Sequence, residues 1–192
     1  MPSAITMLKA DHVVLKRLLR ELNEATTVKQ RERLVSELER AIKTHAQIEE
    51  EVFYPAFKAR TEKTDDVDMF YEAAEEHHVV DMVLPALKAA NPKSHEFEAK
   101  AKVMKDLVEH HIKEEETEMF ATAREVFEEE QLRELGDLMQ ARRETIEAMW
   151  DSPLLRPMKK IQSVAHKFMP TKVKTAKATA IGKAMEIADE AR

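Results

Sequence analysis

The sequence predicts an all-α protein: an up-and-down antiparallel four-helix bundle with a fifth helix and a helical, basic C-terminal extension. Three observations support this fold class. The 192 residues include only two glycines and are rich in Ala, Leu, Glu, Lys and Met, which are strong helix formers. Apolar residues recur at helical spacing through several long segments. The connections between these segments are short, which favours antiparallel neighbours.

Five segments of residues 1–150 carry an apolar stripe, and in the first four a polar residue interrupts it. The inward positions, segment by segment, are Ile5, Leu8, His12, Leu15, Leu19 and Leu22; Leu34, Leu38, Ile42, His45, Glu49, Val52 and Ala56; Phe70, Ala73, His77, Val80, Leu84 and Leu87; Met104, Leu107, His111, Glu115 and Met119; and Leu132, Leu135, Met139 and Ile146. Each stripe predicts one helix with one buried face.

Helix boundary signals agree with this division. Thr27 and Gln30 have the spacing of a capping box, which predicts the start of the second helix. The stretch TDD at 64–66 is expected to open the third helix, and NPKS at 91–94 to separate the third from the fourth.

The charge distribution divides the chain near residue 151. Residues 1–150 hold 33 acidic and 22 basic residues, whereas residues 151–192 hold 4 and 9. We therefore expect a main domain at 1–150 and a basic amphipathic helical tail at 151–192, packed on the bundle or on a second subunit. A lipid or nucleic-acid surface is the alternative for the tail, but its Ala-rich stripes bury little and no aromatic residues separate its lysines.

Several protein classes are excluded by composition. Without cysteine, the chain has no disulfide, thiolate metal site or catalytic thiol. No apolar run approaches transmembrane length, and the N-terminus does not have the pattern of a signal peptide, so we expect a cytoplasmic protein. Two glycines cannot build a Gly-rich phosphate loop.

The polar interruptions repeat between the two halves of the bundle. The distance from His12 to His77 is 65 residues, and His45 and Glu49 recur 66 residues later as His111 and Glu115. A single histidine on an apolar stripe is more often a satisfied core residue than a ligand. Four imidazoles and two carboxylates directed into one core need a partner, because burying them unpaired is costly.

A metal centre satisfies all six residues. His and Glu four positions apart lie on the same face of a helix, so each HxxxE pair presents a nitrogen and a carboxylate to one point. Six such ligands are too many for one tetrahedral ion and suit two ions with bridging carboxylates. Ligation by nitrogen and oxygen without thiolate favours iron or manganese over structural zinc.

Two other metal motifs do not fit the sequence. Ferritin-like di-iron bundles need ExxH on two helices, but this chain has it once, at Glu75 and His78. The HExxH motif of zinc proteases is absent.

The pattern formed by these residues resembles the hemerythrin-like, or HHE cation-binding, family. Its signature here is one His on each of four successive helices, with Glu after the second and fourth, and the typical EEEVFYP at 49–55. The resemblance implies a non-heme di-iron centre ligated by these residues: His12, His45, Glu49, His77, His111 and Glu115. Two iron ions would be bridged by the carboxylates and by an oxo or hydroxo group.

The family binds or turns over oxygen, hydrogen peroxide or nitric oxide, so the expected partner is a diatomic or peroxide ligand. Its oxygen carriers use HxxxH on the third helix, where this chain has Asp81 after His77, and HxxxxD on the fourth. Fewer imidazoles should stabilise oxidised iron, which favours reduction of peroxide or nitric oxide. A sensor or storage module that binds oxygen or iron without turnover is the alternative.

Several neighbours of the six residues are secondary candidates. Glu116, five residues after His111, competes with Glu115 for the ligand role. Tyr54 lies nine residues after His45, nominally on the opposite side of the helix, unless a bulge near Pro55 turns its phenol toward the metal, where it would ligate or donate a proton.

Six further acids and histidines lie outside the predicted ligand set. Asp11 and Glu76 are candidates for orienting imidazoles, with surface acids as the alternative. His78 and His110 lie about 100° from their ligand neighbours on the helix, which predicts surface or supporting roles. His95 and His166 are expected to face solvent.

Overall fold

The computed structural model describes residues 2–61 and 64–152, and all their regular structure is helical. The helices, in chain order, are α1 (Ala4–Glu24), α2 (Val28–Ile48), η1 (Glu49–Phe53), α3 (Tyr54–Arg60), α4 (Thr64–Ala89), α5 (His95–Glu114), η2 (Glu115–Met119), α6 (Phe120–Val126) and α7 (Glu129–Asp151). The elements η1 and η2 are π-helical turns. The predicted tail lies outside the described residues, except for its first two positions.

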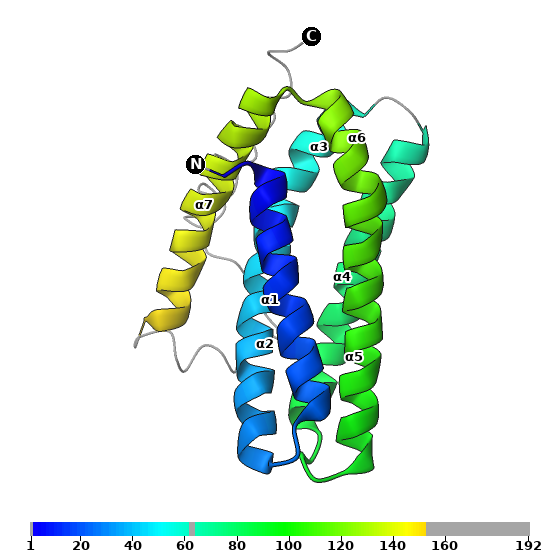
Figure 1. Cartoon of the computed structure of the whole chain (residues 1–192), viewed down its shortest axis with the longest axis vertical. Coiled ribbons are helices and arrows are strands. Elements are labelled where there is room, and N and C mark those ends of the chain that lie inside the picture. Colours follow the sequence, from blue (N-terminus) through cyan, green and yellow to red (C-terminus); the bar gives the residue numbers. More distant parts are fainter. Residues whose placement is uncertain (1, 62–63, 153–192) are drawn as a thin grey trace, which may run out of the picture.

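Four long rods form the bundle drawn in Figure 1. The first is α1, the second runs through α2, η1 and α3, the third is α4, and the fourth runs through α5, η2 and α6. The helix α1 packs against α2 and α5, α4 packs against α5 and α2, and α7 lies along the outside against α1 and α2. The predicted all-α four-helix bundle with a fifth helix is confirmed.

Two of the predicted helix boundaries carry the expected caps, and α4 begins at Thr64, where the stretch TDD begins. Thr27 and Gln30 form the reciprocal capping box at the start of α2. Ser94 caps α5 by accepting a hydrogen bond of 3.1 Å from the Phe97 backbone nitrogen. Each cap satisfies a backbone N–H that the helix itself leaves without a partner.

Two apolar clusters fill the bundle, one on each side of a polar layer. One includes Ile48, Val52, Phe53 and residues from α7, and the other includes the leucines of α1 and α2 together with α4 and α5. The buried polar side chains of the described residues are His12, Thr44, His45, Glu49, Glu51, Thr61, His77, His111 and Glu115. The bundle therefore encloses all six polar residues that interrupt its apolar stripes.

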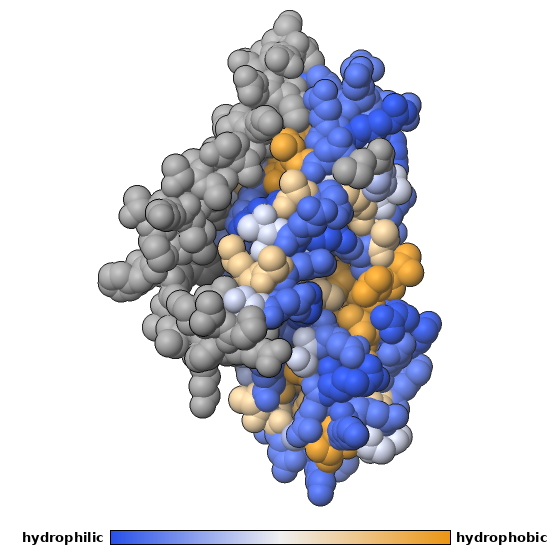
Figure 2. Space-filling model, turned by 90° about the vertical axis from the view of Figure 1, so that its left-hand side faces the viewer, coloured by the Kyte–Doolittle hydropathy of each residue, from blue (hydrophilic) through white to orange (hydrophobic). Residues whose placement is uncertain are grey.

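The surface is polar. On the face drawn in Figure 2, hydrophilic residues predominate and hydrophobic residues form small separate groups. Scattered exposed apolar residues of this kind are ordinary on protein surfaces. Within residues 2–61 and 64–152, none of the helices has the length and apolar character needed to cross a membrane.

Candidate metal centre

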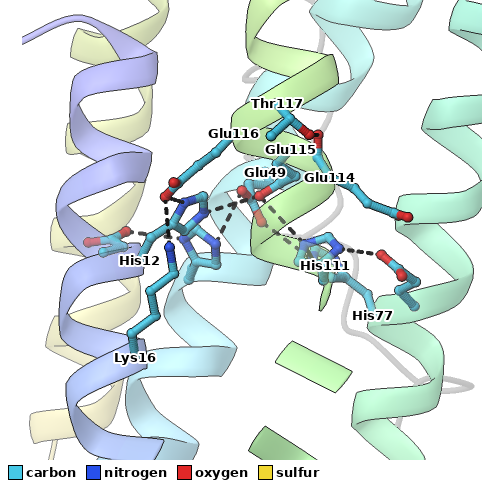
Figure 3. A network of polar contacts seen from close by, with 12 residues as sticks. His12, Lys16, Glu49, His77, His111, Glu114, Glu115, Glu116 and Thr117 are labelled. Carbon is cyan, nitrogen blue, oxygen red and sulfur yellow. Dashed lines mark hydrogen bonds and ion pairs between the residues drawn. The ribbon is translucent and has the colours of Figure 1, made fainter. Parts of the chain in front are cut away.

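The six predicted residues converge inside the bundle. Figure 3 shows His12, Glu49, His77, His111 and Glu115 directed toward one another. Two groups bring ligand atoms within 4.8 Å of one another: His12, His45, Glu49 and Glu115 in the first, and Glu49, His77 and His111 in the second. Because Glu49 belongs to both groups, the two halves of the site adjoin. Residues separated by up to 103 positions in sequence are thus brought together by the antiparallel packing of the four rods.

Each carboxylate lies between imidazoles from both halves. The Nε2 atoms of His45 and His77 lie 3.3 and 3.4 Å from the two oxygens of Glu49. The Oε2 atom of Glu115 lies 3.1 Å from His12 Nε2 and 3.6 Å from His111 Nε2. The two glutamates therefore occupy equivalent central positions, as expected from the repeated HxxxE.

The outer nitrogen of every imidazole faces a carboxylate. The four Nδ1 contacts are His12 with Glu116 at 2.9 Å, His45 with Asp11 at 3.3 Å, His77 with Glu50 at 3.1 Å and His111 with Glu76 at 2.7 Å. Ionised carboxylates only accept hydrogen bonds, so each Nδ1 carries the proton. A ring that carries its single proton at Nδ1 directs its Nε2 lone pair inward, which is the arrangement that supported metal-ligating histidines have.

Five of the inward atoms lack hydrogen bonds. No hydrogen-bond partner exists for Nε2 of His12 and His45, for either oxygen of Glu49 or for Oε2 of Glu115. The Nε2 atoms of His77 and His111 lie 3.1 Å apart, where two lone pairs repel unless a proton or cation lies between them. Each unsatisfied buried polar group costs about 1–3 kcal/mol, so the donor set fits a bound cation pair better than a metal-free core.

The outer acids differ from the sequence expectation in their partners. Asp11 and Glu76 do orient imidazoles, but each contacts a histidine on another helix rather than the one that follows it in sequence. Glu116, the rival ligand, contacts the outer side of His12 and is partly exposed, whereas Glu115 points inward and is 2% exposed. Glu50 was not predicted, although it adjoins Glu49 as Glu116 adjoins Glu115.

Two π-helical turns begin at the central glutamates. The Tyr54 backbone N–H donates to the Glu49 carbonyl, and the Phe120 N–H donates to the Glu115 carbonyl, each five residues back. Pro55 follows the first turn closely, but the second has no proline beside it. The turns therefore recur with the repeated glutamates and do not depend on the proline.

The first π turn places Tyr54 in the site. Nine helical steps of about 100° put this residue opposite His45, but one residue absorbed by the π turn leaves eight steps, a net rotation of about 80°. The buried Tyr54 hydroxyl donates a hydrogen bond of 2.8 Å to Glu115 Oε1. The bulge weighed from the sequence is present, and it brings the phenol to a central carboxylate.

The same position in the other half of the repeat is Phe120. Its ring stacks on His12 with centroids 5.7 Å apart, while the Tyr54 ring lies 5.6 Å from that of His77. At this position the two halves of the site therefore differ by one hydroxyl group, that of Tyr54.

Burial and mutual charge set the protonation of the central groups. Burial raises the pKa of Glu49 well above its ordinary value, and the charge of Glu115 raises it further. Burial also acts on Glu115, but the neighbouring histidines, His111 foremost and then His12 and His45, together outweigh it, and the pKa of this carboxyl falls below its usual range. Burial lowers the pKa of His45 to about 4 despite its contact with Asp11, so this ring is neutral at neutral pH.

The tyrosine stays protonated. Burial raises the pKa of Tyr54 well above its ordinary value, and the charge of Glu115 raises it further. The phenol therefore remains a hydrogen-bond donor at neutral pH, with its proton directed at a central carboxylate oxygen.

The remaining candidates lie away from the centre. Asp81 pairs with Lys43 at 2.6 Å on the surface. His78 and His95 are exposed, as expected. His110 is 59% exposed and faces Glu114 at 3.1 Å, which agrees with its predicted place off the inner face. His166 lies outside the described residues.

The fold and this site define the class of protein. Residues 3–123 match the family described as "Hemerythrin HHE cation binding domain", and the chain belongs to that family. The sequence resemblance is thereby confirmed. Family membership and the His/Glu clusters together support metal binding, typically of iron.

Relatives of similar length exist in mycobacteria. The chain is 31% identical over 154 residues to "Uncharacterized protein Rv2633c" of Mycobacterium tuberculosis (strain ATCC 25618 / H37Rv), covering 79% of this chain and 90% of that one. The crystal structure of a hemerythrin HHE cation binding domain-containing protein, the Rv2633c homolog from Mycobacterium kansasii, superposes with a TM-score of 0.68. The two sequences are 28% identical, and the match covers 96% of this chain and 99% of the M. kansasii chain.

A longer relative shares only part of its length. The chain is 26% identical over 125 residues to a "DNA nickase" of Nostoc sp. (strain PCC 7120 / SAG 25.82 / UTEX 2576). This match covers 65% of the present chain and 34% of the Nostoc protein, so the chain spans about a third of that relative.

Proposed function

We propose that this protein holds two iron ions in the polar layer and uses them to bind and reduce small oxidants, hydrogen peroxide or nitric oxide. The proposed ligands are the six residues named from the sequence: His12, His45, Glu49, His77, His111 and Glu115. The observation that carries the proposal is the set of inward nitrogen and oxygen atoms that have no hydrogen-bond partner.

The paired half-sites support two ions rather than one. Each half supplies two imidazoles, and the two carboxylates lie between the halves with oxygens near imidazoles of both. Imidazole and carboxylate ligands without thiolate suit iron or manganese. An iron pair supplies redox chemistry by exchanging one electron at each ion.

The chain itself buries the central carboxylates and the phenol, and it holds a proton beside them. His12, Glu49, Glu115 and Tyr54 are almost completely buried, and Phe120 covers the ring of His12. Reduction of peroxide to water consumes protons. The Tyr54 hydroxyl holds one at Oη, 2.8 Å from Glu115 Oε1, where it is placed to be donated within the closed site.

The outer acids would hold the imidazoles in place during turnover. Each Nδ1–H contact fixes the tautomer and the orientation of its ring, and raises the basicity of the inward nitrogen. Carboxylates outside the ligand set also favour the more positively charged, oxidised state of the centre, which supports turnover over reversible oxygen carriage.

Stopped-flow spectroscopy of the iron-loaded, reduced protein tests the proposal. The protein is mixed anaerobically with hydrogen peroxide or nitric oxide, and separately with oxygen. We expect the centre to oxidise rapidly with peroxide or nitric oxide and the oxidant to be consumed. Reversible reaction with oxygen alone, without consumption, would instead establish the carrier or sensor function and refute the proposed turnover.

A further inference from the structure

The two halves of the site differ in whether a lysine or arginine neutralises the charge of their outer carboxylates. In the half that contains His12, Lys16 Nζ lies 3.3 Å from Glu116 Oε1, and Arg143 Nη1 from α7 lies 2.9 Å from Asp11 Oδ1. These cations neutralise the outer carboxylates there. That side of the site is also covered, since α7 packs over α1 and α2.

Within the described part of the chain, the outer acids of the other half lack such cations. Among the described residues, Glu50 and Glu76 contact histidine rings but neither a lysine nor an arginine. The outer carboxylates around His77 and His111 therefore leave a net negative charge on the face between α4 and the rod of α5 and η2. A potential of this sign attracts cations.

A small cavity lies on this face. Its volume is about 40 Å³, and its lining includes four glutamates from outside the candidate ligand set: Glu72, Glu76, Glu114 and Glu118. A site needs roughly 10–15 Å³ to hold one water molecule, so the cavity has space for a cation with some of its water. His111 and Glu115 also line it, so the cavity reaches the candidate metal centre.

One residue that lines the cavity is buried and has an acceptor atom without a hydrogen bond. Glu115 is 2% exposed, and its Oε2 has no hydrogen bond. At the outer side, Glu76, His110 and Glu114 bring ligand atoms within 4.8 Å of one another, with His110 Nε2 3.1 Å from Glu114 Oε1. Oxygen and nitrogen ligand atoms thus lie at successive depths between the surface and the candidate metal centre.

We propose that this acidic pocket is the route by which a divalent cation, ferrous iron, reaches the centre. Glu76, His110 and Glu114 make the first contact, and the cation then passes to Glu115 and His111. The inference rests on the proposed iron centre, and it assigns to the outer glutamates a role in the rate of loading rather than in the final ligand set.

The rate of iron loading tests the route. Metal-free protein is mixed anaerobically with ferrous ammonium sulfate at about 0.1 M ionic strength, where the screening length is about 10 Å, and iron that remains unbound is trapped by a chromogenic chelator at set times. In the variant Glu114→Gln/Glu118→Gln we expect loading about tenfold slower than in the wild type, because the attracting charge is reduced. The final iron content should be unchanged.

The matched control is Glu130→Gln/Glu134→Gln, which removes two charges at the same i,i+4 spacing from the exposed surface of α7. It should load within about twofold of the wild type, since exposed charges beyond about 10 Å are screened. Added salt should slow the wild type more than the pocket variant. Far-UV circular dichroism verifies that both variants are folded.

The possible outcomes separate this inference from the proposed function. Wild-type loading of two iron ions, with equally fast loading in the pocket variant, would overturn the route alone. The same slowing in both double variants would also overturn it, since the effect would then be one of total charge. Failure of the wild type to load iron would refute the iron centre on which the route depends.

Discussion

At the residue scale, the two adjacent histidines of α5 provide the sharpest contrast. His111 is buried with its Nε2 directed at the centre, whereas His110 is 59% exposed. We expect His111→Ala to lose bound iron and the visible absorption of the centre. His110→Ala should keep both at equilibrium, with stability changed by no more than about 0.5 kcal/mol, as at other surface sites.

Iron content and absorption spectra of the two variants provide the measurement, with urea unfolding for the stability. An empty centre in His110→Ala and a full one in His111→Ala would mean that the register of α5 is wrong by one residue. The alignment of the two HxxxE pairs between the halves of the bundle would then also be wrong.

Tyr54 gives a second prediction at this scale. Tyr54→Phe removes the only hydroxyl that distinguishes the two halves at this position and leaves Glu115 Oε1 without its donor. We expect the iron content to be retained and peroxide reduction to slow by about 10²-fold, the lower range for a lost proton donor.

The control for this variant is Tyr71→Phe, because Tyr71 is exposed and its hydroxyl contacts Lys58. Peroxide kinetics in the stopped flow compare both variants with the wild type. Equal rates for Tyr54→Phe and wild type would remove the phenol from the account of proton donation.

The six proposed ligand positions could be predicted from the sequence because each interrupts an apolar stripe that had to be buried. Their outer partners could not be predicted in the same way. Asp11, Glu76 and Glu50 contact histidines on other helices, and such pairings depend on the relative rotation of packed helices. Only the repeat offered a signal, since Glu50 precedes Glu116 by the same 66 residues that separate the central glutamates.

At the element scale, α7 is held against the bundle by a close backbone contact. A Cβ atom placed on Gly136 would lie 2.3 Å from the Pro2 carbonyl oxygen and 3.0 Å from the Ala4 nitrogen. We therefore expect Gly136→Ala to separate α7 from the start of α1 and to lower the free energy of unfolding by about 1–3 kcal/mol, as overpacked sites do.

Chemical unfolding of the metal-free protein measures this effect. Glu134→Ala, at an exposed position of the same helix, is the control and should change stability by no more than about 0.5 kcal/mol. Wild-type stability in Gly136→Ala would show that the contact of α7 with the N-terminus is not tight.

The helices themselves were predictable, whereas the sequence signalled only the first of the two π turns, as a bulge near Pro55. Apolar spacing and capping residues place each helix well, since both signals extend over several turns. A π turn adds a single residue to a helix. In the rod of α2, η1 and α3, its effect is to rotate the side chains that follow it relative to an ideal helix. Tyr54 therefore appeared on the wrong side of an ideal helix, while Val52 and Ala56 were buried as expected.

At the scale of the whole molecule, metal binding and stability are linked, because a cation bound only by the folded chain stabilises it. We expect iron to raise the thermal unfolding temperature of the wild type, by a free energy of about 4 kcal/mol at a thousandfold excess over the dissociation constant. His45→Ala and Glu115→Ala should lose most of this gain.

Thermal unfolding with iron and with a chelator measures the gain directly. In the chelator, the two variants should unfold close to the metal-free wild type, because each removes a polar group that the metal-free core leaves unsatisfied. Equal losses of stability with and without iron would show that these residues serve packing alone.

The most direct test of the iron-pair claim is the number of iron ions per chain. Purified metal-free protein is reconstituted anaerobically with ferrous iron, freed of excess by gel filtration, and analysed for iron and protein. We predict about two iron ions per chain, held by four imidazoles and two central carboxylates. Fewer than about one iron per chain, from protein shown to be folded, would contradict the account.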